Sequence, residues 1–242
     1  SYVAFQAVHI PVQAPKAFTD KYIGTYDGGW SELKDKRQKN VKALGLIPDN
    51  TPVKSIRTTK DWDSLSNEEK KFHSKSMAVY AGMVDAMDYN IGRLVTYLKS
   101  IDEYDNTIFV FTSDNGAEAS DPQEVSAVFP LWMKYEDYNN DYETLGEKGS
   151  YNYIGASFAS AAVGPLGHYK FYSGEGGLRV PMIISGKGLS PELKGSLNHS
   201  FTFVKDLAPT FLQLAKTDQP GTHYKGKSIE PITGTSLMPI LS

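Results

Sequence analysis

The chain of 242 residues contains no cysteine, so no thiol within it can act as a nucleophile. Its apolar runs are far shorter than the roughly 18 residues that a membrane-spanning helix requires, and it carries no recognisable signal peptide. The formal net charge is only -3, which argues against binding nucleic acids or other polyanions as a general role. We therefore expect neither a membrane span nor a nucleic-acid partner.

The composition is that of an ordinary folded protein. Hydrophobic residues make up 40% and charged residues 22% of the chain, which is typical of one globular domain with a substantial core. Nothing in this balance suggests disorder.

The most informative segment is Thr107-Ile108-Phe109-Val110-Phe111, followed directly by Thr112-Ser113-Asp114-Asn115-Gly116-Ala117. Five β-branched and aromatic residues in a row predict a strand buried on both faces, and Asp-Asn-Gly predicts the turn that ends it. In open α/β sheets ligands bind at this end of the strands, and the oxygens of Asp114 and Asn115 suit a hard cation such as Ca²⁺ or Mg²⁺. The same tripeptide is also good turn chemistry, so an ordinary turn stays open as the alternative.

A long helix is predicted upstream of this strand. Ser66 and Glu69 have the spacing of a capping box at its beginning, and Lys99 and Asp102 mark its end. Its apolar residues recur every three or four positions and form one stripe that we expect to pack in the core: Tyr80, Met83, Met87, Ile91, Leu94 and Leu98. A helix followed by a strand is the repeat of a sheet with helices on its faces.

Four other elements complete the expected pattern. They are a strand over 2–8 with His9 at its carboxyl end, a helix over 31–42, a second core strand over 179–185 and a helix over 206–215. We expect the basic side chains of the 31–42 helix to form a solvated face: Lys34, Lys36, Arg37, Lys39 and Lys42.

Glycines and tyrosines mark two irregular stretches. Glycines 174, 176 and 177 predict a tight backbone path before the second strand, and residues 225–228 lack the spacing of a phosphate-binding loop. Residues 116–168 contain no long periodic segment and predict a long loop region. The tyrosines between Tyr135 and Tyr153 either line a substrate cleft or anchor a surface loop, and the sequence favours neither interpretation.

Short motifs occur along nearly the whole chain in the order found in one enzyme family. They include residues 3–11, 26–30, 77–81, 87–92, 113–116, 149–151, 169–170, 175–181 and 206–210. In these stretches the chain closely resembles the type I sulfatases of the alkaline phosphatase superfamily, in particular the arylsulfatase branch. The resemblance implies an α/β fold of the alkaline phosphatase type, with a mostly parallel sheet and helices on both faces, here incomplete.

The resemblance also identifies what the chain lacks. The family's nucleophile is a cysteine in a Cys-x-Pro-Ser-Arg segment, oxidised to formylglycine, and its first metal ligands are two adjacent aspartates. Both belong upstream of Ser1 in the family's order, and the smaller C-terminal subdomain would begin near Ser242. We therefore interpret residues 1–242 as the central-to-late part of a sulfatase catalytic domain, a fragment that we expect to be inactive by itself.

The resemblance further implies roles for four residues. Asp114 and Asn115 match metal ligands that complete the oxygen cage of Ca²⁺, with Mg²⁺ as the alternative. His9 and Lys170 match the sulfate-contacting histidine and lysine. Lys170 would bind a sulfate oxygen as a point charge, and His9 could donate a hydrogen bond to the sulfate or to the leaving oxygen. Outside such a context, a lone histidine or lysine is more often structural or merely exposed.

Three functions are compatible with these residues. The first is hydrolysis of an aryl or carbohydrate sulfate ester, and the second is a related phosphonate or phosphodiester hydrolase. The third is a non-catalytic, metal-stabilised binding protein. The resemblance implies a secreted or periplasmic location for the parent protein. If one site is present, side-chain atoms of His9, Asp114 and Lys170 should lie within about 12 Å of one another, at one edge of a parallel sheet.

Overall fold

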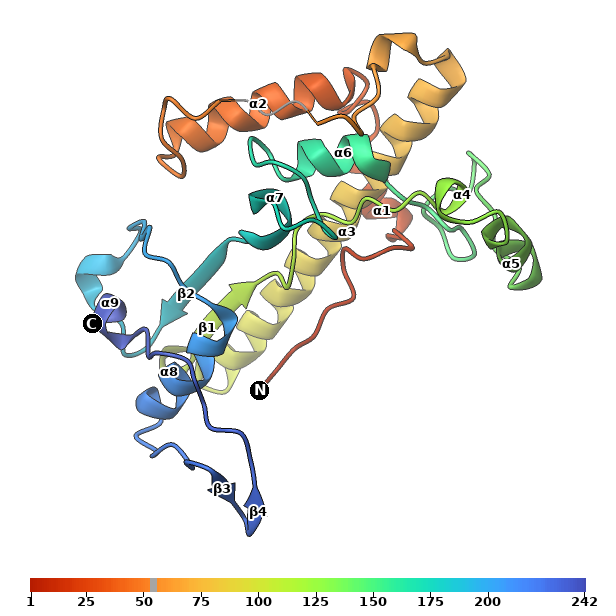
Figure 1. The fold of residues 1–242 in the computed structure, drawn as a ribbon. Helices are drawn as coiled ribbons and strands as arrows, with labels where there is room; N and C mark the ends of the chain where they lie inside the picture. The colour runs from red at the N-terminus through yellow and green to blue at the C-terminus, as the bar shows by residue number, and fades with distance from the viewer. Residues whose placement is uncertain (53–55) are drawn as a thin grey trace. The chain divides into compact units, whose positions relative to one another are not determined.

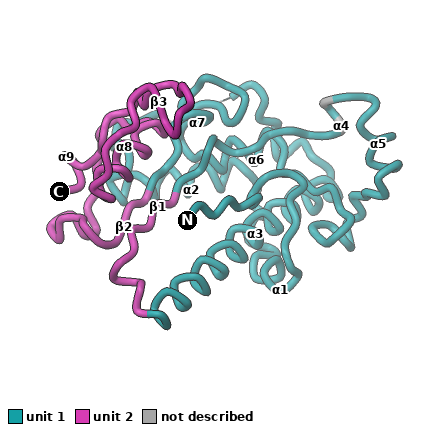
Figure 2. Tube along the Cα trace, turned by 90° about the horizontal axis from the view of Figure 1, so that it is seen from below, with its two compact units in different colours: residues 1–101, 112–182 teal, residues 102–111, 183–242 magenta. Residues whose placement is uncertain are grey.

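The computed structural model describes residues 1–52 and 56–242. This part of the chain divides into two compact units, residues 1–101 with 112–182 and residues 102–111 with 183–242 (Figure 2). No helix in these ranges is long and apolar enough to cross a membrane.

The first unit is built mainly from helices (Figure 1). They are α1 (Lys16–Thr19), α2 (Gly29–Ala43), α3 (Asn67–Ser100), α4 (Pro122–Val125), α5 (Phe129–Tyr135), α6 (Gly155–Ala162) and α7 (Glu175–Leu178).

Helix α3 begins where the capping box predicts. The Ser66 hydroxyl accepts a hydrogen bond from Glu69 N at 3.2 Å, and the Glu69 carboxylate accepts one from Ser66 N at 2.8 Å. These reciprocal bonds satisfy backbone donors that the first turn of a helix leaves unpaired. The sequence therefore located the beginning of this helix to the residue.

The core of the first unit lies between α2, α6 and the first half of α3. Trp30, Trp62 and Phe158 meet edge to face, with ring centroids 4.6 to 6.1 Å apart. Met77 of α3 is fully buried in the same cluster. Edge-to-face contact is the favoured geometry for aromatic rings because the positive ring edge meets the negative face.

The basic residues of α2 do not all face solvent, so that expectation is wrong for two of them. Lys34 is buried and donates to Ser160 Oγ at 3.0 Å, and burial lowers its pKa. Arg37 donates to the carbonyl oxygens of Ala161 and Ala162 at the end of α6. A cation at this place complements the negative end of the helix dipole, which ties α2 to α6.

The apolar stripe of α3 is buried only in part. Tyr80 and Met83 pack against buried residues, but Leu94 is 39% exposed. The 3.6-residue period correctly predicted the helix, yet it does not determine how far along the helix a packing partner extends.

Residues 116–168 are not one long loop, because α4, α5 and α6 lie within them. Each of these helices has eight residues or fewer. Such short helices contain barely two turns, too few for an apolar period to be visible in the sequence.

Strands are few, and the mostly parallel sheet is not confirmed. β1 (Ile108–Thr112) pairs with β2 (Met182–Gly186). The pairing is antiparallel, because Lys187 N donates to Thr107 O at one end and Thr112 Oγ1 donates to Pro181 O at the other. Both strands are partly exposed instead of buried on two faces. Residues 2–8 form no strand, since no described segment pairs with their backbone in a ladder.

The second unit contains α8 (Leu207–Leu214), α9 (Met238–Leu241) and the hairpin of β3 (His223–Tyr224) and β4 (Lys227–Ser228). Helix α8 lies where the sequence predicts it. Residues 225–228, which lack the spacing of a phosphate-binding loop, contain the turn of this hairpin, with φ of 51° at Lys225 and 77° at Gly226. Two successive residues with positive φ are characteristic of the tight hairpin turn that matches strand twist.

Candidate functional site

His9 and Lys170 lie 161 positions apart in sequence and touch in the structure. The Lys170 Nζ atom is 2.9 Å from His9 Nε2. His9 belongs to a turn in which its N–H donates to Gln6 O, and Lys170 follows the buried Tyr169. The two residues therefore meet through turns and loops, and not at the ends of parallel strands as we expected.

Glu118 holds this pair together. Its Oε2 atom lies 2.6 Å from Lys170 Nζ and 3.8 Å from His9 Nε2. Its Oε1 atom accepts hydrogen bonds from the backbone N–H and the hydroxyl of Ser120. One carboxylate oxygen is thus anchored to the protein, and the other faces the Lys170 ammonium and the His9 ring.

Glu118 is a charged residue with little access to water, since its side chain is 10% exposed. Burial alone would raise the pKa of Glu118, but the hydrogen bonds from Lys170 and Ser120 outweigh burial and lower the pKa below its ordinary value. The carboxylate is therefore ionised at neutral pH and compensates the charge of Lys170.

The hydrogen bonds of His9 assign its tautomer. Its Nδ1 atom is 2.7 Å from the carbonyl oxygen of Ile10, and because a carbonyl oxygen can only accept, Nδ1 carries the proton. The Nε2 atom of neutral His9 then has a lone pair, which accepts a hydrogen bond from Lys170 Nζ. His9 can donate from Nε2 only as the doubly protonated imidazolium, a cation that Glu118 is placed to stabilise.

Backbone contacts between glycines set the position of Lys170. Gly116 N donates to Gly177 O at 3.0 Å, and Lys170 N donates to Ala117 O at 3.1 Å. A Cβ atom on Gly116 would lie 1.8 Å from Gly176 O. Only glycine permits this approach, which confirms the predicted tight path and brings the Asp-Asn-Gly turn beside the segment that carries Lys170.

Asp114 and Asn115 lie in a turn that Ser113 stabilises by donating from its hydroxyl to Asn115 O at 2.8 Å. Asp114 is exposed and Asn115 half-buried. Asp114 lies three residues before Ala117, so chain geometry keeps their Cα atoms within about 11 Å. The turn is therefore near Lys170, although the structure shows no hydrogen bond from either side chain to His9 or Lys170.

Asp114 and Asn115 have oxygen atoms of the kind that a hard cation binds, but two ligands are too few for a complete metal site. Their carboxylate and amide oxygens make no hydrogen bond to any described residue, so they are available as ligands. Ca²⁺ takes six to eight oxygen ligands and Mg²⁺ six. The described residues contain no cluster of three or more His, Cys, Asp or Glu side chains that could hold a metal ion. Asp114 and Asn115 can thus form only part of a metal site.

Sequence reasoning missed Glu118. The available signal was an acidic residue between two alanines, Ala117 and Ala119, immediately after the turn. A charged residue in a run of small apolar ones is a candidate for burial against a cation. His168, which precedes Lys170 by two residues, stacks on Tyr172 with ring centroids 4.5 Å apart. Among the described residues it forms no hydrogen bond or ion pair with His9 or Lys170.

Comparison with known proteins identifies the family. The model of the family described as Sulfatase matches residues 1–217. The chain belongs to the sulfatase family. This membership implies the alkaline phosphatase type of fold, and sulfatases generally use a metal ion and a formylglycine.

Two curated sulfatases are similar over nearly the whole chain. An uncharacterised sulfatase of Schizosaccharomyces pombe is 40% identical over 233 residues, covering 95% of this chain and 41% of the relative. An arylsulfatase of Klebsiella aerogenes is 34% identical over 241 residues, covering 99% of this chain and 51% of the relative. The chain thus spans about half the length of the curated sulfatases it matches.

A solved structure, that of Ps i-CgsB, is 24% identical in sequence. The aligned region covers 87% of this chain and 38% of the chain of that structure, with a TM-score of 0.41.

Proposed function

We propose that this chain is the central-to-late part of the catalytic domain of a sulfatase that hydrolyses sulfuric esters. The observation that supports this most is the contact of His9 and Lys170 on the shared carboxylate of Glu118, within a chain of the sulfatase family. The contact brings an ammonium and an imidazole from distant parts of the sequence to one place, and both groups can donate to a sulfate when His9 is doubly protonated. The chain has no cysteine, so a formylglycine must come from residues outside it.

Each residue of the pair has its own role in this proposal. Lys170 binds a sulfate oxygen as a point charge and stabilises the negative charge that grows as the ester bond breaks. Protonated His9 donates from Nε2 to the sulfate or to the leaving oxygen. Glu118 is a positioning residue: it does not touch the substrate, but it holds Lys170 and compensates the two positive charges.

Asp114 and Asn115 would hold Ca²⁺, or alternatively Mg²⁺, together with ligands from outside this chain. Such a cation supplies electron withdrawal from the sulfuryl oxygens. One anionic and one neutral ligand from this turn keep the local charge low enough for an anionic sulfate to approach. The substrate is an aryl or carbohydrate sulfate, and the complete protein is secreted or periplasmic, as sulfatases often are.

Activity of the complete protein on nitrophenyl sulfate tests the proposal. Lys170→Ala should lower kcat by roughly 100-fold, as expected for removing one charge-stabilising donor. Glu118→Gln should lower kcat more than it raises KM, because the carboxylate acts through Lys170 and His9. Lys148→Ala, which removes an exposed lysine from the same unit, is the matched control and should leave kcat unchanged.

Two results would contradict the proposal. The first is a complete protein that cleaves nitrophenyl phosphate or a phosphonate ester but no sulfate ester, which would favour the related hydrolase. The second is sulfatase activity that survives Lys170→Ala.

A further inference from the structure

Four aromatic rings form a cluster between α5 and the segment around Tyr151. Phe129, Trp132, Tyr138 and Tyr151 contact one another with ring centroids 5.0 to 5.8 Å apart. Tyr138 stacks on Trp132, and Trp132 remains 40% exposed. The tyrosine-rich stretch is therefore neither a featureless loop nor fully buried, because it presents ring surfaces to solvent.

Backbone hydrogen bonds connect the cluster to the segment that follows His9. Tyr151 N donates to Asn139 O at 2.8 Å, and Val12 N, three residues after His9, donates to Asn152 O at 2.8 Å.

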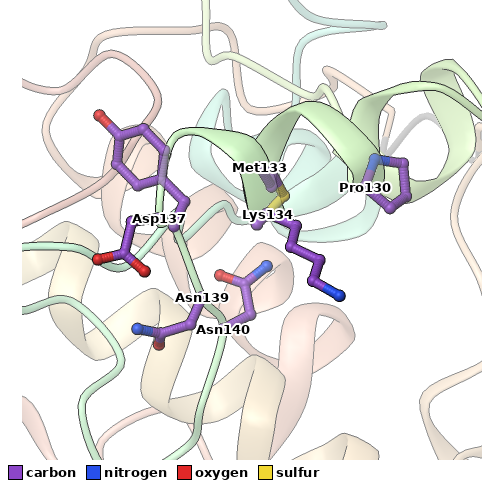
Figure 3. A pocket seen from close by; sticks show the side chains of 7 residues that line it. Pro130, Met133, Lys134, Asp137, Asn139 and Asn140 are labelled. Carbon is purple, nitrogen blue, oxygen red and sulfur yellow. The ribbon is translucent and has the colours of Figure 1, made fainter.

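A groove of about 470 Å³ lies along α5 and the residues that follow it, and Tyr138 of the aromatic cluster is part of its lining. Pro130 and Met133 supply apolar surface, and the polar lining includes Lys134, Asp137 and Asn139. Figure 3 shows Lys134, Asp137 and Asn139 on the same side of helix α5. The volume is within the range of small-molecule sites and is large enough for one or two sugar rings.

Three polar side chains of the groove have atoms that are available to a ligand. Within residues 1–52 and 56–242, the Lys134 ammonium and the Asp137 carboxylate form no ion pair with each other or with another residue. Asn139 uses its side-chain oxygen for Asp141 N and Thr144 Oγ1, which leaves its amide N–H groups available. The groove thus offers donors, one acceptor carboxylate and one cation.

We propose that this groove is a saccharide subsite of the same active site, which makes the substrate a sulfated saccharide chain instead of a simple aryl sulfate. A sugar ring has apolar C–H faces that fit Tyr138, Pro130 and Met133, and hydroxyls that fit Asp137 and Asn139. A further sulfate on the chain pairs with Lys134. This inference rests on the proposed sulfatase function.

The test compares two substrates with one set of variants in the complete protein. Lys134→Ala should lower kcat/KM for a sulfated oligosaccharide about tenfold, the effect of losing one charged hydrogen bond, and should change kcat/KM for nitrophenyl sulfate less than about twofold. Asp137→Asn should behave similarly. Asparagine tolerates the φ of 58° at position 137, so this change removes charge without straining the backbone.

Two exposed positions provide matched controls. Leu131→Ala alters the same helix outside the groove, and Lys148→Ala removes a lysine outside the groove. Both should leave the ratio of the two kcat/KM values unchanged. Calorimetric binding of the sulfated oligosaccharide and of its desulfated counterpart gives a second readout, and only the sulfated ligand should lose affinity in Lys134→Ala.

The outcomes separate the two proposals. One outcome is that the protein hydrolyses nitrophenyl sulfate, while Lys134→Ala changes neither the hydrolysis rate nor the binding of the sulfated saccharide. This outcome would overturn the proposed subsite and leave the proposed sulfatase function standing. Absence of hydrolysis of every sulfate ester would overturn the proposed function, while calorimetry still decides whether the groove binds the saccharide through Lys134.

Discussion

The two halves of helix α3 have the same apolar period but different surroundings. In the first half Met77, Ala78 and Val79 are fully buried. In the second half Leu94 is 39% and Tyr97 59% exposed. A helix displays the same pattern whether or not a neighbour covers it, so amphipathicity predicts the element but not its partner.

The largest effect should come from the covered half. Met77→Ala removes a side chain that is completely buried beside Phe158, and it leaves a cavity that the aromatic cluster cannot easily fill. We expect a loss of about 2–5 kcal/mol in the free energy of unfolding, measured with urea. A loss below about 1 kcal/mol would show that this half is loosely packed in solution.

A smaller effect, dependent on pH, is expected from His73 in the same half of α3. Its ring contacts Trp30 at 5.5 Å, and burial lowers its pKa, with Lys60 adding to the decrease. The folded protein therefore keeps His73 neutral at a pH at which the unfolded chain binds a proton. Its contribution to stability is complete above the unfolded pKa of about 6.5 and is lost as the pH falls below that value.

Urea unfolding between pH 7 and pH 5 measures this contribution. His73→Gln should lose less stability over this range than the unchanged chain, and His199→Gln, at an exposed position, should lose as much as the unchanged chain. Equal pH dependence in all three proteins would mean that His73 is not protected from protonation.

The smallest effect should come from the exposed half. Leu94→Ala exchanges one good helix former for another at a partly exposed position, so we expect a change below about 1 kcal/mol. If Leu94→Ala in the complete protein costs as much as Met77→Ala, then residues outside the described chain cover this half. That result would sharpen the comparison by locating the missing contacts on α3.

Local signals in the sequence were sufficient for some elements. The capping box of Ser66 and Glu69 located the beginning of α3, and the apolar period predicted its length. Residues 206–215 predicted α8 because Pro209 fits the first turn of a helix. These features depend on residues that are close to one another in sequence, so the sequence alone is enough to predict them.

Features that depend on distant residues could not be predicted. The strand expected over 2–8 needs a neighbour to bond with, and the buried strand at β1 needs layers to cover it. Lys34 and Arg37 looked like solvated cations because nothing in α2 reveals that α6 lies against them. The resemblance to a family gave His9 and Lys170, but the carboxylate between them is visible only in three dimensions.

The glycines beside the candidate site have a consequence for mutational scanning. Cβ atoms at Gly116, Gly176 and Gly177 would lie 1.8, 2.1 and 2.3 Å from backbone oxygens, so every substitution there forces chain segments apart. A saturation library would therefore score these positions as intolerant as Lys170, although none of the three has a side chain that could take part in a reaction. Intolerance next to Asp114 and Asn115 would then report crowding of the backbone, and only a separation of folded yield from turnover would distinguish it from chemistry.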